Sequence, residues 1–537
     1  MKKIAIIGSG PTGIYTFYSL LARGEPLAVS VYEQGDEAGV GMPYRDDDNA
    51  KMMLANIASI EIPPLFVTYL DWLKSLSAGH LARYDVDPAS LHVRQFLPRL
   101  LLGEYFRAQF IELVARARRS GFAVTVREQC QVTDLEATDR GVRLRTGDGA
   151  PPELFDLAVV ATGHVWPDDS TATRTYFPSP WSGLMEARIP ACQVGIMGTS
   201  LSGIDAAMAV AVQHGRFNET DDEQITFTLN PESAALRIVL MSRSGILPEA
   251  DFYCPIPYEP LKVVTPEAIE HAINAGSPGL LDRIFRLMVA EIEAADPAWS
   301  RHIALRTRDA DSMAAAWFAD RQRHHPFHWA LANLNEVERN KRDRRTVAWR
   351  YAILRLHEGV EEVVPHLDDA DRERFRRGLA RVFIDNYAAI PSQSIRRLLA
   401  LREAGVVSIR ALGEDYQLRQ AGEHTVISAE GHTCTFAVFI DARGQRPLAT
   451  RDLPFPTLRA QLQTTGEALP DVGEDYTLHA PECVRGRIAF GALPYLMHDR
   501  PFVQGITVSA EIGAAIAGAV AGSASRTRRW LPATERD

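Results

Sequence analysis

The sequence predicts an α/β protein with two parallel-sheet domains and a mainly helical domain inserted into the second. Three observations support this prediction. Two stretches, IAIIGSGPTGIYTFYSLL from position 4 and VGIMGTSLSGIDAAMAVA from position 194, each join an apolar strand to a helix through a glycine-rich turn. From about 256 to 385 the pattern becomes long, charged and helical, with apolar residues three and four positions apart. Strand patterns then return and complete the sheets.

The first glycine turn has the spacing of a dinucleotide-binding fingerprint. Residues 4–7 form a short apolar run, which is typical of a strand covered on both faces of a parallel sheet. Gly8 permits a tight turn, Gly10 leaves room for a pyrophosphate, and Gly13 allows helix and strand to pack closely. The phosphate charge is expected at the start of the following helix. The predicted contact residues are Gly8, Gly10, Pro11, Thr12 and Gly13.

The second strand, LAVSVYEQ, ends in an acidic residue. Glu33 follows Gly13 by twenty positions, where this fingerprint has a carboxylate that accepts hydrogen bonds from a ribose. Gln34 is predicted to lie beside the same nucleotide. Two alternatives remain open: the glycines only tighten a strand–helix corner, and Glu33 is an ordinary solvated charge.

The second turn predicts a further nucleotide site. Gly198 and Gly203 keep the spacing, whereas Ser200 replaces the middle glycine. The next strand ends in Ser242-Arg243, and a guanidinium favours a 2′-phosphate, which indicates NADP(H). That strand comes some forty residues after the turn, so we expect an inserted polar loop near 214–235; Arg243 as a surface charge is the alternative. The predicted NADP residues are Gly198, Thr199, Ser200, Leu201, Ser202, Gly203, Ser242 and Arg243.

Composition limits the classes of function. A chain of 537 residues is expected to form two or three domains, and a net charge of −10 argues against nucleic acid or an anionic membrane as partner. The five cysteines lie far apart, which favours reduced thiols over disulfides or a metal site. The apolar run at the N-terminus is too short for a signal peptide, and the stretch from 506 to 522 is too short to span a bilayer. We expect a cytoplasmic protein with no bound metal.

Besides the two glycine turns, the chain contains four further motifs. They are VVATGHVWP at 159–167, SRSGILP at 242–248, IDARGQRP at 440–447 and FGALPYLMHDRPFVQGITVSAEIG at 490–513. In this order the chain resembles the bacterial FAD/NAD(P)-binding family related to flavin-dependent N-hydroxylating monooxygenases. The resemblance spans nearly the whole chain. It implies two Rossmann-like dinucleotide-binding domains, the first for FAD and the second for NADP(H).

The resemblance also implies further flavin contacts. Val132 would meet the adenine through its backbone, and Thr162-Gly163 would form the turn that crosses between domains. Asp441 would approach the flavin together with the start of a helix near Thr507, whose positive end would favour reduced flavin. The alternatives are an ordinary strand end at 162–163 and glycines that only relieve crowding. The C-terminal contact residues are Gln504, Gly505, Ile506 and Thr507.

The domain boundaries follow from these assignments. The FAD domain is expected at 1–165 and 445–537, the NADP domain at 166–255 and 386–444, and the helical, substrate-side insert at 256–385. In the segment GMPYRDDDNAKMMLANIAS, Asn56 is the polar residue expected nearest the reacting face, with the capping of a turn as the alternative.

The predicted function is an NADPH-dependent FAD monooxygenase that hydroxylates the nitrogen of a small amine or amino acid, L-aspartate being the most specific suggestion, through a flavin hydroperoxide. O2 is the co-substrate. Arg344, Arg345 and Arg350 are candidate partners for substrate carboxylates, although a solvated helix face explains the same basic run. A flavoprotein reductase without oxygen insertion and a non-catalytic escort protein are the alternatives.

Overall fold

The computed structural model describes residues 1–45, 52–165, 172–220 and 224–522. The chain divides into two compact units. The first unit contains residues 1–165 and 445–537, and the second contains residues 166–444. The chain therefore leaves the first unit after Val165 and returns to it at Gln445.

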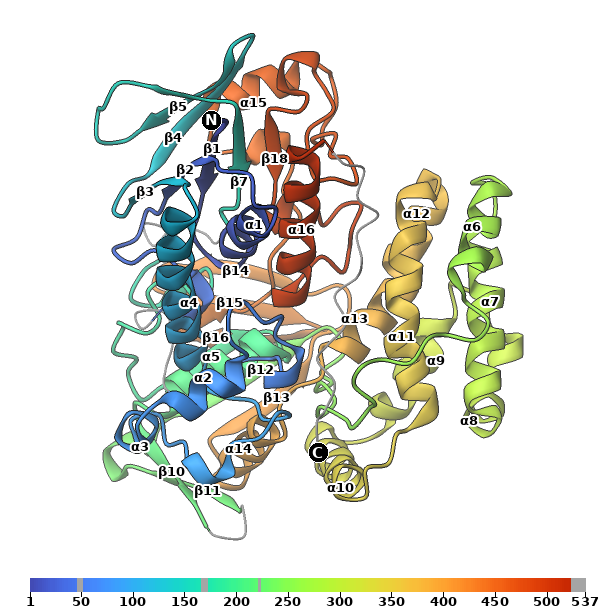
Figure 1. Ribbon diagram of the computed structural model, residues 1–537. Helices are drawn as coiled ribbons and strands as arrows, with labels where there is room; N and C mark the ends of the chain where they lie inside the picture. Colours follow the sequence, from blue (N-terminus) through green and yellow to red (C-terminus); the bar gives the residue numbers. More distant parts are fainter. Residues whose placement is uncertain (46–51, 166–171, 221–223, 523–537) are drawn as a thin grey trace. The chain divides into compact units, whose positions relative to one another are not determined.

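The first unit is built on a parallel sheet (Figure 1). All residues of its strands at 157–160 and 488–490 are buried, as expected for a sheet that is covered on both faces. In spatial order the strands are β18 (Ile488–Phe490), β7 (Leu157–Val160), β1 (Lys3–Ile7), β2 (Ala28–Tyr32) and β3 (Ala123–Arg127). Between β3 and β7 the chain forms an antiparallel meander of β4 (Val132–Thr138), β5 (Gly141–Thr146) and β6 (Glu153–Phe155).

Two helices lie side by side in this unit, α1 (Pro11–Ala22) and α16 (Gly505–Val520) (Figure 1). Small residues allow the contact, since a Cβ on Gly513 would come within 2.6 Å of the backbone of Tyr15 and Thr16. The apolar C-terminal stretch thus forms a helix that packs on α1. The other helices are α2 (Tyr69–Ser75), α3 (Ala78–Ala82), α4 (Arg99–Arg119) and α15 (Pro456–Gln463).

The second unit repeats this spatial order of strands, except that its edge strand β8 (Tyr176–Phe177) comes before the central strands in the chain, whereas β18 comes after them. Its parallel sheet has the spatial order β13 (Val407–Ala411), β12 (Arg237–Ser242), β9 (Gln193–Met197), β17 (Val438–Asp441) and β8. A meander of β14 (Gln417–Ala421), β15 (His424–Ala429) and β16 (His432–Phe436) again precedes the return strand. In this arrangement β9, β12 and β13 take the places of β1, β2 and β3. The two glycine turns therefore occupy equivalent positions in two related sheets.

The segment near 214–235, expected as a polar loop, contains regular structure. It forms an antiparallel hairpin of β10 (Gly215–Glu219) and β11 (Ile225–Leu229), followed by a 3-10 turn at Pro231–Ser233. Phe217 and Phe227 pair across the hairpin with ring centroids 4.9 Å apart. A hairpin satisfies its own backbone and can lengthen the connection between α5 (Leu201–Ala211) and β12 without disturbing the sheet.

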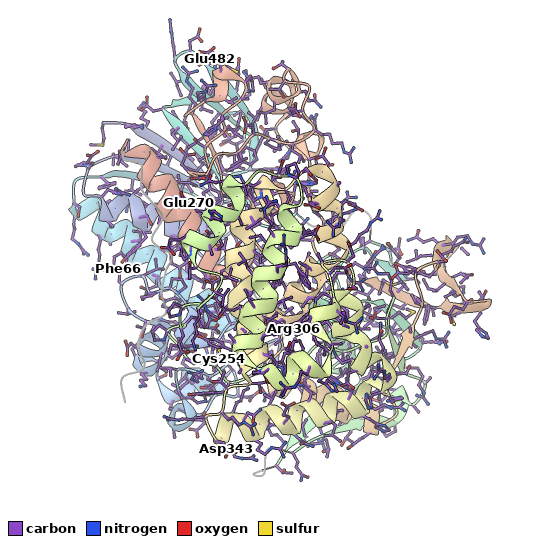
Figure 2. The ribbon with its side chains drawn as sticks, turned by 90° about the vertical axis from the view of Figure 1, so that its right-hand side faces the viewer. Phe66, Cys254, Glu270, Arg306, Asp343 and Glu482 are labelled. Carbon is purple, nitrogen blue, oxygen red and sulfur yellow. The ribbon has the colours of Figure 1, made fainter. Side chains whose placement is uncertain are left out.

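Helices fill the chain between β12 and β13 (Figure 2). Several of these helices begin with a capping side chain. The Thr265 side chain accepts a hydrogen bond from the Ala268 N–H, and the Asp296 side chain accepts one from the Trp299 N–H. In Figure 2, Glu270 marks the first helix and Asp343 marks the end of α10. The helices are α6 (Pro266–Asn274), α7 (Leu280–Ala295), α8 (Pro297–His302), α9 (Met313–Arg323), α10 (Pro326–Arg342), α11 (Ala348–Val363), α12 (Asp369–Arg377), α13 (Leu379–Tyr387) and α14 (Ser392–Glu403).

The helices of the protein differ in length and in apolar character. In the part of the chain that the structure describes, none is both long enough and apolar enough to cross a bilayer.

Candidate functional site

The glycine turn between β1 and α1 is the first candidate site. Gly8 has a φ of +97°, and a Cβ there would lie 2.3 Å from the carbonyl oxygen of Ala161. A Cβ on Gly13 would lie 2.1 Å from the carbonyl oxygen of Gly8. For Gly10, the only described atom within 4 Å of such a Cβ is the Cα of Gly41, at 3.4 Å. Gly8 and Gly13 are therefore required by the fold, whereas Gly10 keeps open a space that suits a pyrophosphate.

Glu33 faces this turn. Its Oε2 accepts a hydrogen bond from the Ser9 hydroxyl at 2.7 Å and from the Ser9 N–H at 3.2 Å, while Oε1 accepts from the Gly35 N–H at 2.9 Å. The Ser9 hydroxyl in turn accepts from the Gly39 N–H at 2.8 Å. The carboxylate is thus held beside the glycine turn, with exposed Gln34 next to it, and the expected ribose contact stays a prediction. Sequence reasoning missed Ser9, although its place between two fingerprint glycines was a usable signal.

The loop after β2 lies against the same turn, and its glycines were not singled out from the sequence. Gly41 has a φ of +85°, and a Cβ there would come within 3.0 Å of the Pro11 ring and 3.1 Å of the Gly10 Cα. Arg45 follows, with its guanidinium 3.5 Å from the Asp36 carboxylate. The two glycines of EAGVGMPY directly after the second strand were the available signal.

The carboxyl ends of three strands meet at this turn. The Ala161 N–H donates to the Ile7 carbonyl at 2.8 Å, and the Gly491 N–H donates to the Val160 carbonyl at 2.8 Å. These bonds align the ends of β1, β7 and β18. Thr162 and Gly163 follow β7 directly, and Thr162 is exposed. Ligands of open parallel sheets bind at this edge, so the expected position of Thr162-Gly163 suits a cofactor contact.

Two helices also begin there. The Thr12 hydroxyl in the first turn of α1 donates to Ser509 Oγ at 3.1 Å, which brings the starts of α1 and α16 together. The first turns of both helices lack an acidic residue. Helix starts without carboxylates favour an anionic ligand. Of the predicted residues of this helix, Gln504 is its N-cap residue, Gly505 and Ile506 open it, and Thr507 is partly exposed in its first turn.

Val132 begins β4 and is buried. The residues before it run beside the end of β2, since the Gln129 N–H donates to the Gly35 carbonyl and the Cys130 N–H to the Glu33 carbonyl, both at 2.8 Å. The backbone leading to Val132 therefore lies next to Glu33. This position is compatible with the expected adenine contact, which stays a prediction.

The second candidate site is the turn between β9 and α5. Gly198 has a φ of +142°, and a Cβ there would lie 2.9 Å from the Ala442 carbonyl oxygen; a Cβ on Gly203 would lie 2.3 Å from the Gly198 carbonyl oxygen. These contacts repeat those of Gly8 and Gly13. Ser200 is the N-cap residue of α5 but its side chain makes no capping hydrogen bond. Leu201 and Ser202 begin a helix whose first turn again lacks an acidic residue.

Ser242 takes the place that Glu33 has in the first unit. The Thr199 hydroxyl donates to Ser242 Oγ at 3.0 Å, and the Gly245 N–H donates to the same oxygen at 3.0 Å. Arg243 follows at the end of β12, with Nη1 3.2 Å from an Oε2 of Glu414. Both side chains are more than half exposed, so this ion pair is weak.

Asp441 lies in the second unit, in agreement with the expected domain boundaries. This residue ends β17 in the second unit, paired with Met197 of β9, and therefore lies beside the second glycine turn. Its Oδ1 accepts from the Arg443 Nε at 2.8 Å, an interaction that helps to raise the pKa of Arg443. The flavin contact that the family resemblance implies for Asp441 stays a prediction.

Asn56 is exposed in the first unit. It does not cap the following turn, because Ala58 is the N-cap residue of the 3-10 helix Ser59–Glu61. The Asn56 side chain has no hydrogen-bond partner among the described residues. Residues 46–51 of the same segment lie outside the described residues. A role for Asn56 at the reacting face stays a prediction.

The three candidate substrate arginines have different environments. Arg344 and Arg345 are exposed after α10. Arg350 is only 4% exposed, with Nε 2.8 Å from Glu249 Oε2 and the guanidinium 4.7 Å from the Trp349 ring centre. Arg350 is therefore committed to the protein interior, which contradicts its expected role as a substrate contact. Arg350 belongs to the helix at 348–363, and it lies on the face of that helix that is buried in the folded protein.

The fold and its two turns define a protein with paired dinucleotide-binding domains, and comparison with family models agrees. A model described as "FAD-NAD(P)-binding" matches residues 5–165, and a model described as "YdhS-like middle domain" matches residues 265–387. Residues 5–165 are thus an FAD- and NAD(P)-binding domain. The second match covers most of the helices between β12 and β13.

One relative identifies the family. The chain is 65% identical over 531 residues to the Escherichia coli (strain K12) protein named "Uncharacterized protein YdhS", covering 99% of both chains. The chain belongs to the family of this protein.

Solved structures show the same fold at low sequence identity. Ornithine hydroxylase (PvdA) from Pseudomonas aeruginosa matches with a TM-score of 0.52 and 13% identity, covering 97% of this chain and 98% of that one. The ornithine N-hydroxylase KtzI from Kutzneria sp. 744 matches with a TM-score of 0.50 and 12% identity over the same shares. The chain thus has the fold of the N-hydroxylating flavin monooxygenases.

Proposed function

We propose that the protein is an NADPH-dependent flavin monooxygenase that oxygenates the nitrogen of a small amine or amino acid. The observation that carries the proposal is the pair of equivalent glycine turns, the first within an FAD- and NAD(P)-binding domain and the second followed by Arg243. The fold shared with two ornithine hydroxylases supports the class of reaction.

The residues of the first turn fit FAD. The open space at Gly10 suits the pyrophosphate, Glu33 suits the adenosine ribose, and the two helix starts supply N–H groups without competing carboxylates. Bound FAD would supply the redox chemistry, accepting a hydride from NADPH and activating O2. The protein's own contribution is to hold both nucleotides in place and to position the amine.

Oxygenation of nitrogen requires an amine with a free lone pair. The substrate must therefore lose the proton of its ammonium form, and we expect turnover to rise with pH until that amine is neutral. Amino acids are the first substrates to test, with L-aspartate as the specific candidate.

The test follows NADPH oxidation by the holoenzyme with and without O2, across a panel that contains aspartate, ornithine, lysine and simple amines. We expect one substrate to accelerate aerobic oxidation and to yield a hydroxylamine, oxime or nitroso product by mass spectrometry. The Gly10→Val protein serves as the control for flavin dependence. If all the electrons from NADPH end in hydrogen peroxide and no product with an oxygenated nitrogen forms, the protein is a flavoprotein reductase and not a monooxygenase.

Cofactor preference gives a separate prediction. We expect the wild-type protein to prefer NADPH to NADH, and Arg243→Ala to weaken NADPH binding by roughly ten- to a hundredfold, because a charge-assisted phosphate contact contributes about 1.5 to 3 kcal/mol. NADH binding should change little. The measurement is KM and Kd for both nucleotides.

Glu414→Gln is the matched control for this prediction. It removes the carboxylate that now pairs with Arg243, so NADPH binding should stay the same or tighten. If Arg243→Ala keeps the wild-type preference for NADPH over NADH, a residue other than Arg243 binds the 2′-phosphate.

A further inference from the structure

A cavity of about 790 Å³ lies within the helical domain of the second unit. The end of α7, the short helix α8, the last turns of α10 and the start of α11 form its walls. Its volume is in the range of sites for small molecules. None of its lining residues belongs to either glycine turn.

Three arginines line this cavity, Arg301, Arg339 and Arg345. Within the described part of the chain none of the three has a carboxylate partner or a side-chain hydrogen bond. Other arginines of the same domain are paired, for example Arg374 with Asp282 at 2.8 Å. Positive charge is therefore concentrated at the cavity without being used to hold the helices together.

The two acidic residues of the wall are already engaged. Asp296 accepts a hydrogen bond from the Trp299 N–H at 3.0 Å and so caps α8. Glu336 lies 3.5 Å from the guanidinium of the buried Arg350. The three unpaired guanidinium groups thus outnumber the carboxylates, and both carboxylates have partners of their own.

Neutral donors complete the wall. Asn340 is only 6% exposed, lines the cavity, and has no side-chain hydrogen bond to any described residue. The sixteen-residue helix α11 also begins at this wall, with no capping side chain and no acidic residue in its first turn. Trp349, stacked on Trp299 at 4.4 Å, adds a flat apolar surface.

We propose that this cavity is a binding site for a small molecule with at least two acidic groups, either carboxylates or phosphates. Guanidinium groups bind both kinds of oxyanion through paired hydrogen bonds, and three of them can share two acidic groups of one ligand. Asn340 and the N–H groups at the start of α11 would complete the contacts. The site goes beyond the proposed function, because the same residues would bind such a ligand whether or not nitrogen is oxygenated.

Isothermal titration calorimetry of the full-length holoprotein tests the site, with citrate, succinate and pyrophosphate as probes at constant ionic strength. We expect at least one probe to bind, and Arg345→Ala or Arg339→Ala to weaken it by about ten- to a hundredfold. The better probe distinguishes a carboxylate ligand from a phosphate ligand. Acetate, with one charge, should bind much more weakly.

Arg342→Ala is the matched control, since Arg342 is exposed on α10 near the cavity but does not line it. Its effect should stay within about twofold, as for a screened surface charge. Asn340→Ala is a second test that leaves the net charge unchanged, and it too should weaken binding. The proposal is overturned if no probe binds the wild type, or if Arg342→Ala weakens binding as much as Arg345→Ala. Dependence on Arg345 also separates this site from pyrophosphate bound at the glycine turns.

Discussion

The Gly10→Val protein is expected to fold and to purify without FAD. A branched side chain at this position enters the space that the turn keeps open, where the pyrophosphate must approach the backbone. The nearest described atom to a Cβ at Gly10 is the Gly41 Cα at 3.4 Å, so the turn itself has room for a first side-chain atom. The flavin absorbance ratio of the purified protein and its circular dichroism measure the two parts of this expectation.

Two further variants separate cofactor loss from misfolding. Gly10→Ala should fold and keep part of its flavin, because its single methyl group fits the turn. Gly13→Val should fold poorly, since its Cβ would lie 2.1 Å from the Gly8 carbonyl oxygen. Full flavin occupancy in Gly10→Val would show that the pyrophosphate of FAD does not bind at this turn.

Arg350→Ala is expected to lower the free energy of unfolding by about 3 to 5 kcal/mol. It leaves Glu249 as a buried carboxylate without the guanidinium that lies 2.8 Å from it. Burial raises the pKa of Glu249, and Arg350 and Arg321 oppose that rise. Chemical denaturation monitored by tryptophan fluorescence measures the loss.

The destabilisation should depend on pH in a defined direction. Without Arg350 the pKa of Glu249 in the folded protein rises further above its value in the unfolded chain. Folding then takes up a proton, so the variant is most stable below the unfolded pKa and loses stability as pH rises through the folded one. The deficit relative to wild type should therefore be smaller at pH 5 than at pH 8.

Glu249→Gln/Arg350→Met is the control for this pair, because it removes both charges and keeps most of the volume. It should recover much of the stability and the pH dependence should disappear. Arg342→Ala, on the exposed surface, should change stability by less than about 0.5 kcal/mol. An Arg350→Ala protein of wild-type stability that fails only to bind substrate would restore the sequence-based role of Arg350.

Much of the fold could be predicted because its signals are local. A strand, a glycine turn and a helix are specified within about twenty residues, and Gly8 and Gly13 are required by contacts inside that stretch. The repeated topology of the second unit follows from the second copy of the same signal. The hairpin at 215–229 was missed because its polar, partly exposed strands lack the apolar runs of the central sheet.

The sequence by itself determined the two nucleotide turns and the helical insert, since each depends on neighbouring residues. Only the tertiary structure decided what the isolated charges do. Arg350 pairs with Glu249 about a hundred positions away, and Arg345 lines a cavity. Arg345 and Arg350 are both charged residues near a helix end, so the sequence around them does not distinguish their roles. The role of each depends on which distant element packs over it, and that packing is fixed by the burial of the whole apolar core.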